Sequence, residues 1–196
     1  MFRTPVHVRD ASPDDAAHLV DVWATNRVAS SADSFLPAVD EAAASVARVS
    51  ADPDQRILIA FNDDRVAGAA HLMRGPITPI HADDAVYVMH LQVVEGERRH
   101  GVGRALLEAS VRWAEEKGAA HLLTAASVGS RDANRFMARL GLGQVAVIRG
   151  ATVAALRGKL PVEPPAVARV GARSHRSVSQ VLVQRRSLRR SQAHPS

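Results

Sequence analysis

The sequence predicts an α/β (α+β) fold with helices on both faces of a mixed, mostly antiparallel sheet, and two patterns along the chain indicate it. In the first, apolar runs at 56–61 and 66–74 flank the turn composition Asn-Asp-Asp-Arg, which is typical of an antiparallel hairpin. In the second, an apolar run at 85–94, a helical pattern at 102–117 and another apolar run at 121–127 follow one another. This order predicts a central βαβ unit whose two strands are parallel.

The N-terminal part predicts a short strand and then two helices. Residues 5–9 alternate between polar and apolar side chains, as a strand does. Ser12 is suited to cap a helix, Pro13 suits its first position, and two aspartates follow at the positive end of the helix dipole. A weaker helical pattern covers 41–49 and ends before Pro53. The apolar positions at helical spacing in the first helix are Ala16, Leu19, Val20 and Trp23.

Three further segments follow the βαβ unit. Residues 130–140 predict a helix that Ser130 caps and that Gly141 ends. Residues 144–149 have the composition of a strand, whereas 152–160 fit a strand and a helix equally well. Because the pattern does not locate a last strand, pairing between subunits in a homodimer stays open.

The composition limits the classes of protein that the chain can represent. Its 196 residues, 46% of them hydrophobic, suit one domain with a substantial core and an appendage. The absence of cysteine excludes disulfides and thiol nucleophiles, and the nine histidines show no metal-ligand spacing, so we expect no metal. No apolar run reaches the ~18 residues of a membrane span, and the first residues lack the apolar segment of a secretory signal. We therefore expect a cytoplasmic protein.

A proline-containing linker and a basic tail are expected at 161–196, after a domain at 1–160. The segment 161–196 holds seven arginines against one acid, whereas the whole chain has a net charge of +5. The domain is therefore slightly acidic, and its composition does not indicate nucleic-acid binding. The tail is either solvated or contacts a partner, nucleic acid or an anionic membrane. A short helix in it would align the apolar residues Val178, Val181, Leu182 and Leu188.

A basic turn with two glycines lies between the long strand and the long helix. The first amide groups of a helix have no partner within the helix, and the helix dipole adds partial positive charge there. Gly101 and Gly103 carry no side chain that would block an approaching anion. The preceding residues Arg98, Arg99 and His100 add positive charge. The pattern favours a phosphate site, with an ordinary helix start and a nucleic-acid contact as the alternatives.

Two common nucleotide-binding motifs do not fit this turn. The dinucleotide fingerprint requires a third glycine where Leu106 stands. The P-loop requires Gly-Lys-Ser or Gly-Lys-Thr where residues 103–105 are Gly-Arg-Ala. The phosphate therefore belongs to a different ligand.

Residues 91–118 resemble the acyl-CoA-binding motif of the GNAT superfamily of N-acetyltransferases. The family pattern is Arg/Gln-x-x-Gly-x-Gly/Ala, and the run from Arg98 to Gly103 matches it. The order of strands and helices over residues 5–150 also resembles that fold. The resemblance implies a GNAT-like domain that uses acetyl-CoA as its co-substrate.

The same resemblance implies where the co-substrate binds. Amides of the turn at 98–104 would hold the CoA pyrophosphate. The strand at 85–94 would splay from the strand at 121–127, with pantetheine between them, and the main chain of Leu91 and Val93 would bind the acyl end. The cofactor-binding residues that follow are Leu91, Gln92, Val93, Arg98, Arg99, His100, Gly101, Val102, Gly103, Arg104, Ser130 and Asn134.

Acetyl transfer to an amine requires a base, because an alkylamine has a pKa near ~10.4 and is protonated at neutral pH. Many family members also carry a tyrosine acid at a position that is Met137 here, and a thioether donates no proton. Tyr87 and His90 are the candidate catalytic residues, each acting through ordered water, and His71 and His81 are weaker candidates.

The alternation of side chains along the strand at 85–94 sorts its residues into two faces. One face is expected to carry Tyr87, Met89, Leu91 and Val93. The opposite face is expected to carry His90, Gln92 and Val94.

The expected function is an N-acetyltransferase. It transfers an acetyl group from acetyl-CoA to a primary amine of a small molecule or a protein, by direct attack in a ternary complex. The alternative is an acyl-CoA-binding regulatory module with little or no turnover, which the methionine at the tyrosine position favours. A third hypothesis is a nucleic-acid binder that acts through the basic tail.

Overall fold

The structure is a computed structural model that describes residues 5–24, 37–80, 82–127 and 129–160. The linker and basic tail expected at 161–196 lie outside these residues, and so does His81. The chain divides into two compact units, residues 1–145 and 146–196, and each unit is described by itself.

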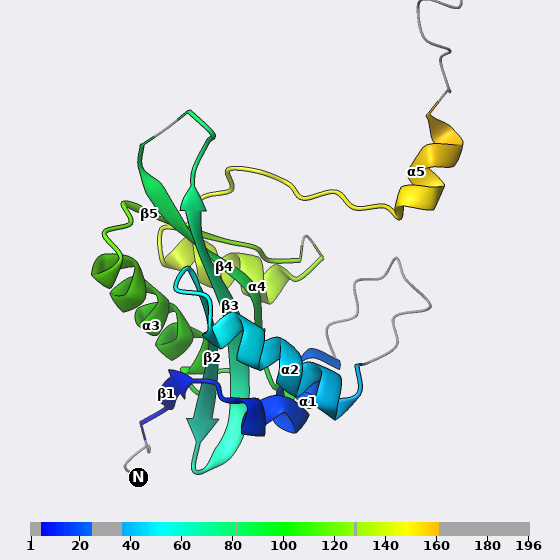
Figure 1. Cartoon of the computed structure of the whole chain (residues 1–196). Helices are drawn as coiled ribbons and strands as arrows, with labels where there is room; N and C mark the ends of the chain where they lie inside the picture. Colours follow the sequence, from blue (N-terminus) through cyan, green and yellow to red (C-terminus); the bar gives the residue numbers. More distant parts are fainter. Residues whose placement is uncertain (1–4, 25–36, 81, 128, 161–196) are drawn as a thin grey trace, which may run out of the picture. The chain divides into compact units, whose positions relative to one another are not determined.

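A five-stranded sheet forms the centre of the first unit, with the strand order β1-β2-β3-β4-β5 (Figure 1). The pairs β1–β2, β2–β3 and β3–β4 are antiparallel, and β4–β5 is parallel. This arrangement confirms the predicted hairpin, the βαβ unit and the mixed sheet. The strands are β1 (His7–Asp10), β2 (Gln55–Asn62), β3 (Arg65–Pro76), β4 (Asp84–Val93) and β5 (His121–Thr124).

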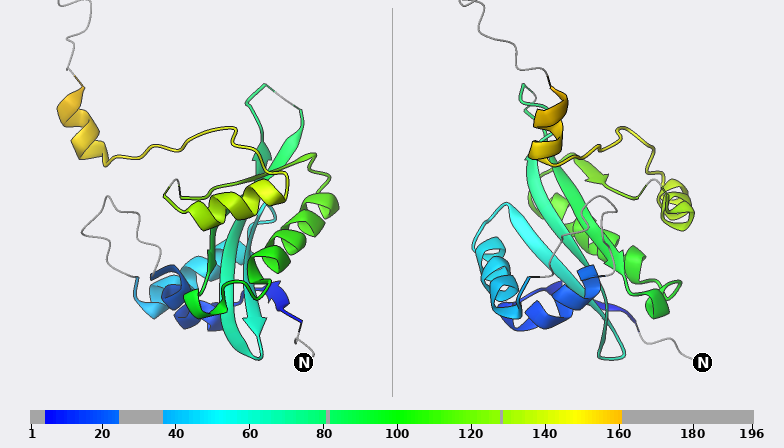
Figure 2. Two further views of the ribbon diagram at one scale, coloured as in Figure 1. Left: turned by 180° about the vertical axis from the view of Figure 1, so that it is seen from behind. Right: turned by 90° about the vertical axis from the view of Figure 1, so that its right-hand side faces the viewer.

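Helices cover both faces of this sheet, as the sequence predicts (Figure 2). The α1 and α2 helices pack on one face, and α3 and α4 pack on the other. The elements of the first unit are the 3-10 turn η1 (Pro13–Asp15), α1 (Ala16–Ala24), α2 (Val39–Ser50), the 3-10 turn η2 (Glu95–Glu97), α3 (Val102–Glu116) and α4 (Arg131–Arg139).

The core consists of two apolar clusters separated by the sheet. On the α3 side, the apolar face of the helix places Leu106 and Trp113 against Val86 and Val88 of β4, and all four side chains are buried. On the other side, Leu19 and Val22 of α1 and Val46 of α2 pack in one cluster with Ile57, Ile59 and Ala69 on the opposite face of β2 and β3. The helical pattern predicted for residues 102–117 is therefore that of an amphipathic helix with one buried face.

The start of the first helix is tied to β1 by an ion pair between the buried Asp15 carboxylate and the partly exposed Arg9 guanidinium. The Asp15 carboxylate accepts hydrogen bonds of 2.7 and 2.8 Å from the Arg9 guanidinium and one of 2.8 Å from the Ser12 amide. The Arg9 guanidinium holds the pKa of this carboxyl well below its usual range, and the Ser12 contacts act in the same direction. Ser12 and Pro13 hold the capping positions that the sequence predicts.

Near the end of the described chain, one segment corrects the prediction and a second resolves an ambiguous one. Residues 144–149 form no strand, because a strand requires a hydrogen-bonded neighbour and alternating apolar residues alone do not supply one. Val145 and Ile148 are accordingly exposed. The ambiguous segment 152–160 contains α5 (Val153–Lys159), and Thr152 caps that helix.

Candidate active site

The α3 helix begins in the geometry of an anion site. Gly101, the residue before the helix, has φ +89°, which a residue with a side chain rarely adopts. No side chain caps the helix start. The first helical hydrogen bond runs from the Ala105 amide to the Gly101 carbonyl over 3.0 Å. The amides of Val102, Gly103 and Arg104 therefore lie outside the hydrogen bonding of the helix itself.

The basic side chains around this turn have acidic partners. Arg98 lies 3.9 Å from Glu95, and Arg104 lies 3.0 Å from Glu108. His100 Nδ1 lies 4.0 Å from a Glu97 oxygen. Arg99 has φ +65° and helps to turn the chain into the helix. These ion pairs reduce the local positive charge, so the main-chain amides are the principal anion-binding groups of the turn.

The strands β4 and β5 stop pairing before β4 ends. Their ladder runs from Ala85–His121 to Val88–Thr124, while Met89–Val93 continues beyond the last β5 residue; we call this stretch the β4 extension. Its end approaches the start of α3, because a Cβ built on Gly103 would lie 3.7 Å from Val93 Cγ2. The end of the extension therefore lies next to the helix start.

A buried hydroxyl marks the point where the two strands part. Thr124 pairs with Val88 in the last step of the ladder. Its Oγ1 is buried and has no hydrogen-bond partner among the residues that the structure describes. A buried hydroxyl without a partner costs free energy, so a polar ligand group between the parted strands would stabilise it. This residue escaped the sequence analysis because nothing local distinguishes it from other strand threonines.

A bulge at His90 corrects the predicted faces of β4. His90 has φ +51°, and the pairing with β3 shifts from Gln92–Ala69 to Met89–His71, so β4 carries an extra residue. Leu91 therefore packs in the apolar cluster on the α3 side of the sheet, which we call the α3 cluster, together with Val86, Val88 and Val93. The prediction that Tyr87 and Met89 share a face with Leu91 and Val93 is wrong, because the bulge shifts the alternation by one residue.

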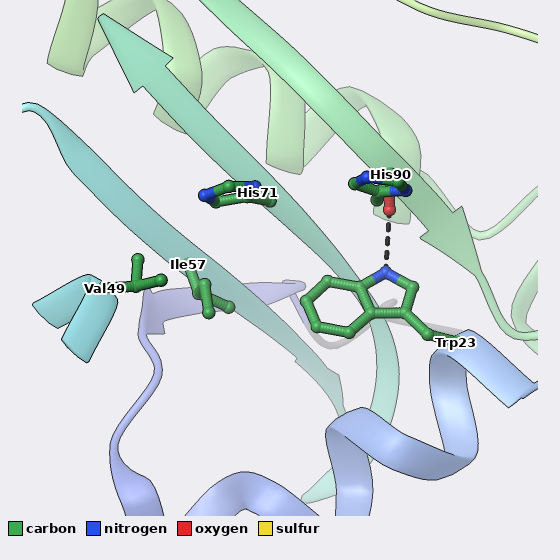
Figure 3. Close-up of a pocket in the computed structure, with 5 residues that line it drawn as sticks. All are labelled: Trp23, Val49, Ile57, His71 and His90. Atoms are coloured by element: carbon green, nitrogen blue, oxygen red, sulfur yellow. Dashed lines mark hydrogen bonds between the residues drawn. The ribbon is translucent and has the colours of Figure 1, made fainter. Parts of the chain in front are cut away.

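On the other face of the sheet, a cavity of about 290 Å³ lies between α1, α2 and the strands (Figure 3). We call it the α1/α2 cavity, and it is lined by Trp23, Val49, Ile57, His71 and His90. Each lining residue comes from a different element, in the order α1, α2, β2, β3 and β4. None of these lining residues carries a carboxylate. Because His90 belongs to the β4 extension, the cavity reaches the same stretch of β4 that continues to the start of α3.

Three hydrogen bonds hold the polar groups around the α1/α2 cavity. The Trp23 indole Nε1 donates to the His90 main-chain carbonyl over 2.8 Å (Figure 3). His71 Nε2 lies 3.0 Å from Gln55 Oε1, and the Gln55 amide nitrogen donates to Asp52 over 2.7 Å. Burial lowers the pKa of His71, and the neighbouring His90 adds to this effect. His71 is therefore neutral at neutral pH.

Tyr87 and His90, the candidate catalytic residues from the sequence, lie in different environments. The Tyr87 hydroxyl donates to the Pro76 carbonyl over 2.8 Å, and Tyr87 is not among the residues lining the α1/α2 cavity. His90 does line the cavity, but as an exposed side chain at the bulge. His71 has its partner Gln55 16 residues away in the sequence, and only the β2–β3 pairing brings the two together.

At the start of α4, the side chains of Ser130 and Asn134 form hydrogen bonds with main-chain groups of the same segment. Ser130 Oγ accepts from the Ala133 amide over 3.3 Å and so caps the helix. The Asn134 side chain donates to the carbonyls of Ser127 and Ser130 over 3.0 and 2.7 Å. Met137 is 8% exposed and packs in the α3 cluster. The position of the family tyrosine is therefore filled by an apolar core residue.

Within the four described ranges, no group of three or more histidine, aspartate or glutamate side chains is arranged to hold a metal ion. In the same ranges, the helices lack the length and apolar character that crossing a membrane requires.

The sheet, its parted strands and the uncapped start of α3 together define an acetyltransferase fold. Residues 21–142 match the model of the acetyltransferase (GNAT) family, and the chain belongs to this family. The resemblance seen in the sequence is thereby confirmed. Among curated protein sequences there is no significant match.

Solved structures share the fold at low sequence identity. A transcriptional regulator from Bacillus halodurans C-125 superposes with a TM-score of 0.61 at 19% identity, covering 76% of this chain and 99% of the other. Aminoglycoside N-acetyltransferase AAC(6')-Iy in complex with CoA gives 0.61 at 15% identity, covering 76% and 94%. Glucosamine-6-phosphate N-acetyltransferase from Arabidopsis thaliana gives 0.62 at 13%, covering 76% and 99%.

Proposed function

We propose that the protein transfers the acetyl group of acetyl-CoA to a primary amine of a small molecule or a protein, by direct attack within a ternary complex. The observation that carries the proposal is that the unpaired β4 extension, Met89–Val93, ends next to the uncapped start of α3. Membership of the acetyltransferase family supports it, and so do similar structures that contain CoA or a CoA analogue.

The residues present fit acetyl-CoA as the co-substrate. The amides of Val102, Gly103 and Arg104 are suited to hold the pyrophosphate, because they point out of the helix start and carry its partial positive charge. Main-chain groups of the β4 extension, at Leu91 and Val93, are suited to bind the acyl end, and the Thr124 hydroxyl offers a further polar contact. When bound, acetyl-CoA supplies an acetyl group activated as a thioester.

The protein's own residues then have two tasks in the transfer. Main-chain amides near the acyl end polarise the carbonyl, which favours attack by the amine. A base must first accept a proton from the protonated amine. No proton donor stands at Met137, so the leaving thiolate, with a pKa of ~8.5 for a comparable thiol, takes its proton from the amine or from water.

A regulatory acyl-CoA-binding module is the second candidate, and the buried Met137 is the observation that favours it. The two functions differ in turnover. Both require acetyl-CoA to bind, but only the enzyme releases CoA when an amine is present.

Two measurements test the proposal. Isothermal titration with acetyl-CoA examines binding, and a thiol-release assay with DTNB over a panel of amines and peptides examines turnover. The chain contains no cysteine, so every thiol that DTNB detects belongs to CoA. We expect saturable binding and amine-dependent release. Binding without release from any acceptor would favour the regulatory module, and no binding at millimolar acetyl-CoA would overturn both.

A further inference from the structure

We propose that the α1/α2 cavity is the acceptor site, that it takes a compact primary amine with an apolar body, and that His71 is the general base. This inference rests on the proposed acetyltransferase function and adds a substrate class and a catalytic residue to it. The cavity and the β4 extension share His90, so an amine in the cavity lies next to the stretch of β4 assigned to the acyl end.

The hydrogen bonds around His71 determine which ring nitrogen can act as a base. The Asp52 carboxylate only accepts hydrogen bonds, so the Gln55 group that faces it is the amide NH₂. The Gln55 carbonyl oxygen therefore faces His71 and accepts from Nε2–H. Nε2 thus carries the proton of the neutral ring, and Nδ1 keeps its lone pair. The chain from Asp52 through Gln55 holds His71 in the tautomer of a base.

The surroundings of His71 keep the ring neutral and available. The group that faces it from β4 is the titratable His90, and from β2 it is the uncharged Gln55. The helices α1 and α2 contribute Trp23 and Val49 to the cavity, and neither is charged. No carboxylate among the cavity-lining residues competes for the proton.

The lining of the cavity selects the acceptor. An indole, a valine and an isoleucine offer apolar surface, and about 290 Å³ is at the small end of ligand pockets. A polycationic amine would meet no compensating negative charge among the lining residues that the structure describes, so its charges would remain costly to desolvate. A monoamine with an aryl or branched alkyl body has only one charged group to desolvate when it enters the cavity. The apolar surroundings lower the pKa of its ammonium group and so ease that proton loss.

The proposed reaction balances as follows. His71 Nδ1 takes one proton from the ammonium group and becomes an imidazolium. The amine nitrogen forms a bond to the thioester carbon, the carbon–sulfur bond breaks, and the sulfur leaves with the electron pair. The second amine proton passes to the thiolate through water, and the imidazolium returns its proton to solvent. The products are the N-acetyl amine, CoA and one proton.

The test compares acceptors and variants in the full-length protein. The thiol-release assay uses phenethylamine and isoamylamine as compact apolar amines, and kanamycin and spermidine as polycations. We expect kcat/KM for the apolar amines to exceed that for the polycations by at least about tenfold. The His71→Gln variant should lower kcat by about 10²–10⁴-fold while acetyl-CoA binding, measured by titration, stays unchanged.

The pH profile keeps the test decisive if His71→Gln lowers expression. In the wild type, kcat should fall at acid pH as His71 becomes protonated. Gln55→Glu places a carboxylate beside His71 and should raise the pKa of the imidazole, so the fall of kcat at acid pH (the acid limb of the profile) should move to higher pH. The inference is overturned by a preference for polycations, by full kcat in His71→Gln, by an unmoved limb in Gln55→Glu, or by acetyl-CoA binding without turnover of any apolar amine. Absence of acetyl-CoA binding would instead contradict the proposed function itself.

Discussion

The indole nitrogen of Trp23 donates a 2.8 Å hydrogen bond to the main-chain carbonyl of His90, 67 residues further along the chain. This bond connects α1 directly to the bulge of β4. At the bulge, a residue with φ +51° turns its carbonyl out of the regular ladder, and the indole satisfies that carbonyl. One side chain therefore both lines the α1/α2 cavity and binds the β4 extension, so this hydrogen bond connects the proposed acceptor site to the proposed co-substrate site.

Trp23→Phe tests this link, because it removes the N–H donor and keeps an aromatic ring. We expect a loss of about 0.5–1.5 kcal/mol in the free energy of unfolding from the missing hydrogen bond. We also expect a rise in KM for the amine that exceeds any change in acetyl-CoA affinity. Urea unfolding and steady-state kinetics measure the two effects.

The matched control is Trp113→Phe, in the core on the opposite face, where Trp113 is 1% exposed. It should lower stability through lost packing without a selective effect on the amine KM. Equal effects of the two variants on the amine KM would contradict the link.

Gly68 allows β3, β4 and α3 to approach one another. A Cβ at this position would lie 2.6 Å from the Gln92 carbonyl oxygen and 3.1 Å from Val102 Cγ1. Gly68→Ala should therefore push the β4 extension away and lower the free energy of unfolding by about 1–3 kcal/mol. The matched control is Gly75→Ala on the same strand, whose Cβ would meet only Tyr87 at 4.0 Å. Similar urea midpoints for the two variants would show that this close approach is not required.

Stability should decrease at mildly acid pH because of His71. Burial lowers the pKa of this imidazole in the folded protein below its ordinary value of 6.5. A histidine with a lowered folded pKa contributes stability above the unfolded pKa, and this contribution is lost as the pH falls below it. Urea unfolding at about pH 7.5 and about pH 5.5 should show the loss in the wild type and a smaller loss in His71→Gln. Equal losses would assign the acid sensitivity to other groups.

Asp15 provides a second, independent test of electrostatics. Asp15→Asn leaves the Arg9 guanidinium without its carboxylate and should cost about 1.5–3 kcal/mol, the range for hydrogen bonds to charged groups. Because the pKa of Asp15 is lowered in the folded protein, its carboxylate stabilises the fold at pH values above the ordinary pKa of a carboxyl group. This stabilisation is lost as the pH falls below that ordinary pKa. The neighbouring Asp14→Asn variant, at an exposed position, should change stability by less than about 0.5 kcal/mol. Thermal unfolding of both variants at neutral pH distinguishes them.

The parts of the fold that depend on local chemistry could be predicted from the sequence. The glycines and basic residues before α3 mark its start, because helix caps and the helix dipole act over a few residues. The hairpin and the βαβ unit also follow from short-range patterns. These features sufficed to predict the fold class and the family.

The parts that depend on contacts distant in the sequence could not be predicted. The apolar run of β4 gives no sign of the bulge at His90, which arises from its register with β3. His71 gains its partner only through the pairing of β2 with β3. Residues 144–149 have the pattern of a strand, but pattern does not provide a neighbour.

The start of α3 can be tested with a substitution that favours the helix but opposes a phosphate. Gly103→Asp places a negative charge in the first turn, which stabilises the helix through its dipole. The same charge should repel the pyrophosphate and raise the Kd for acetyl-CoA at least about tenfold, which corresponds to about 1.4 kcal/mol. Val111→Asp, on the exposed side of the same helix, is the control and should leave Kd unchanged. Equal Kd values for the two variants would place the pyrophosphate elsewhere.

Amine-dependent release of CoA tests the central claim most directly. Purified protein is mixed with acetyl-CoA and phenethylamine, and the free thiol is followed with DTNB, to which this cysteine-free chain contributes no signal. The proposed function and acceptor site predict thiol release that saturates with both substrates and depends on the protein. Saturable acetyl-CoA binding with no release from phenethylamine would contradict the proposed acceptor site, and no release from any amine or peptide of the panel would contradict the claim that this acetyltransferase-family protein acetylates amines.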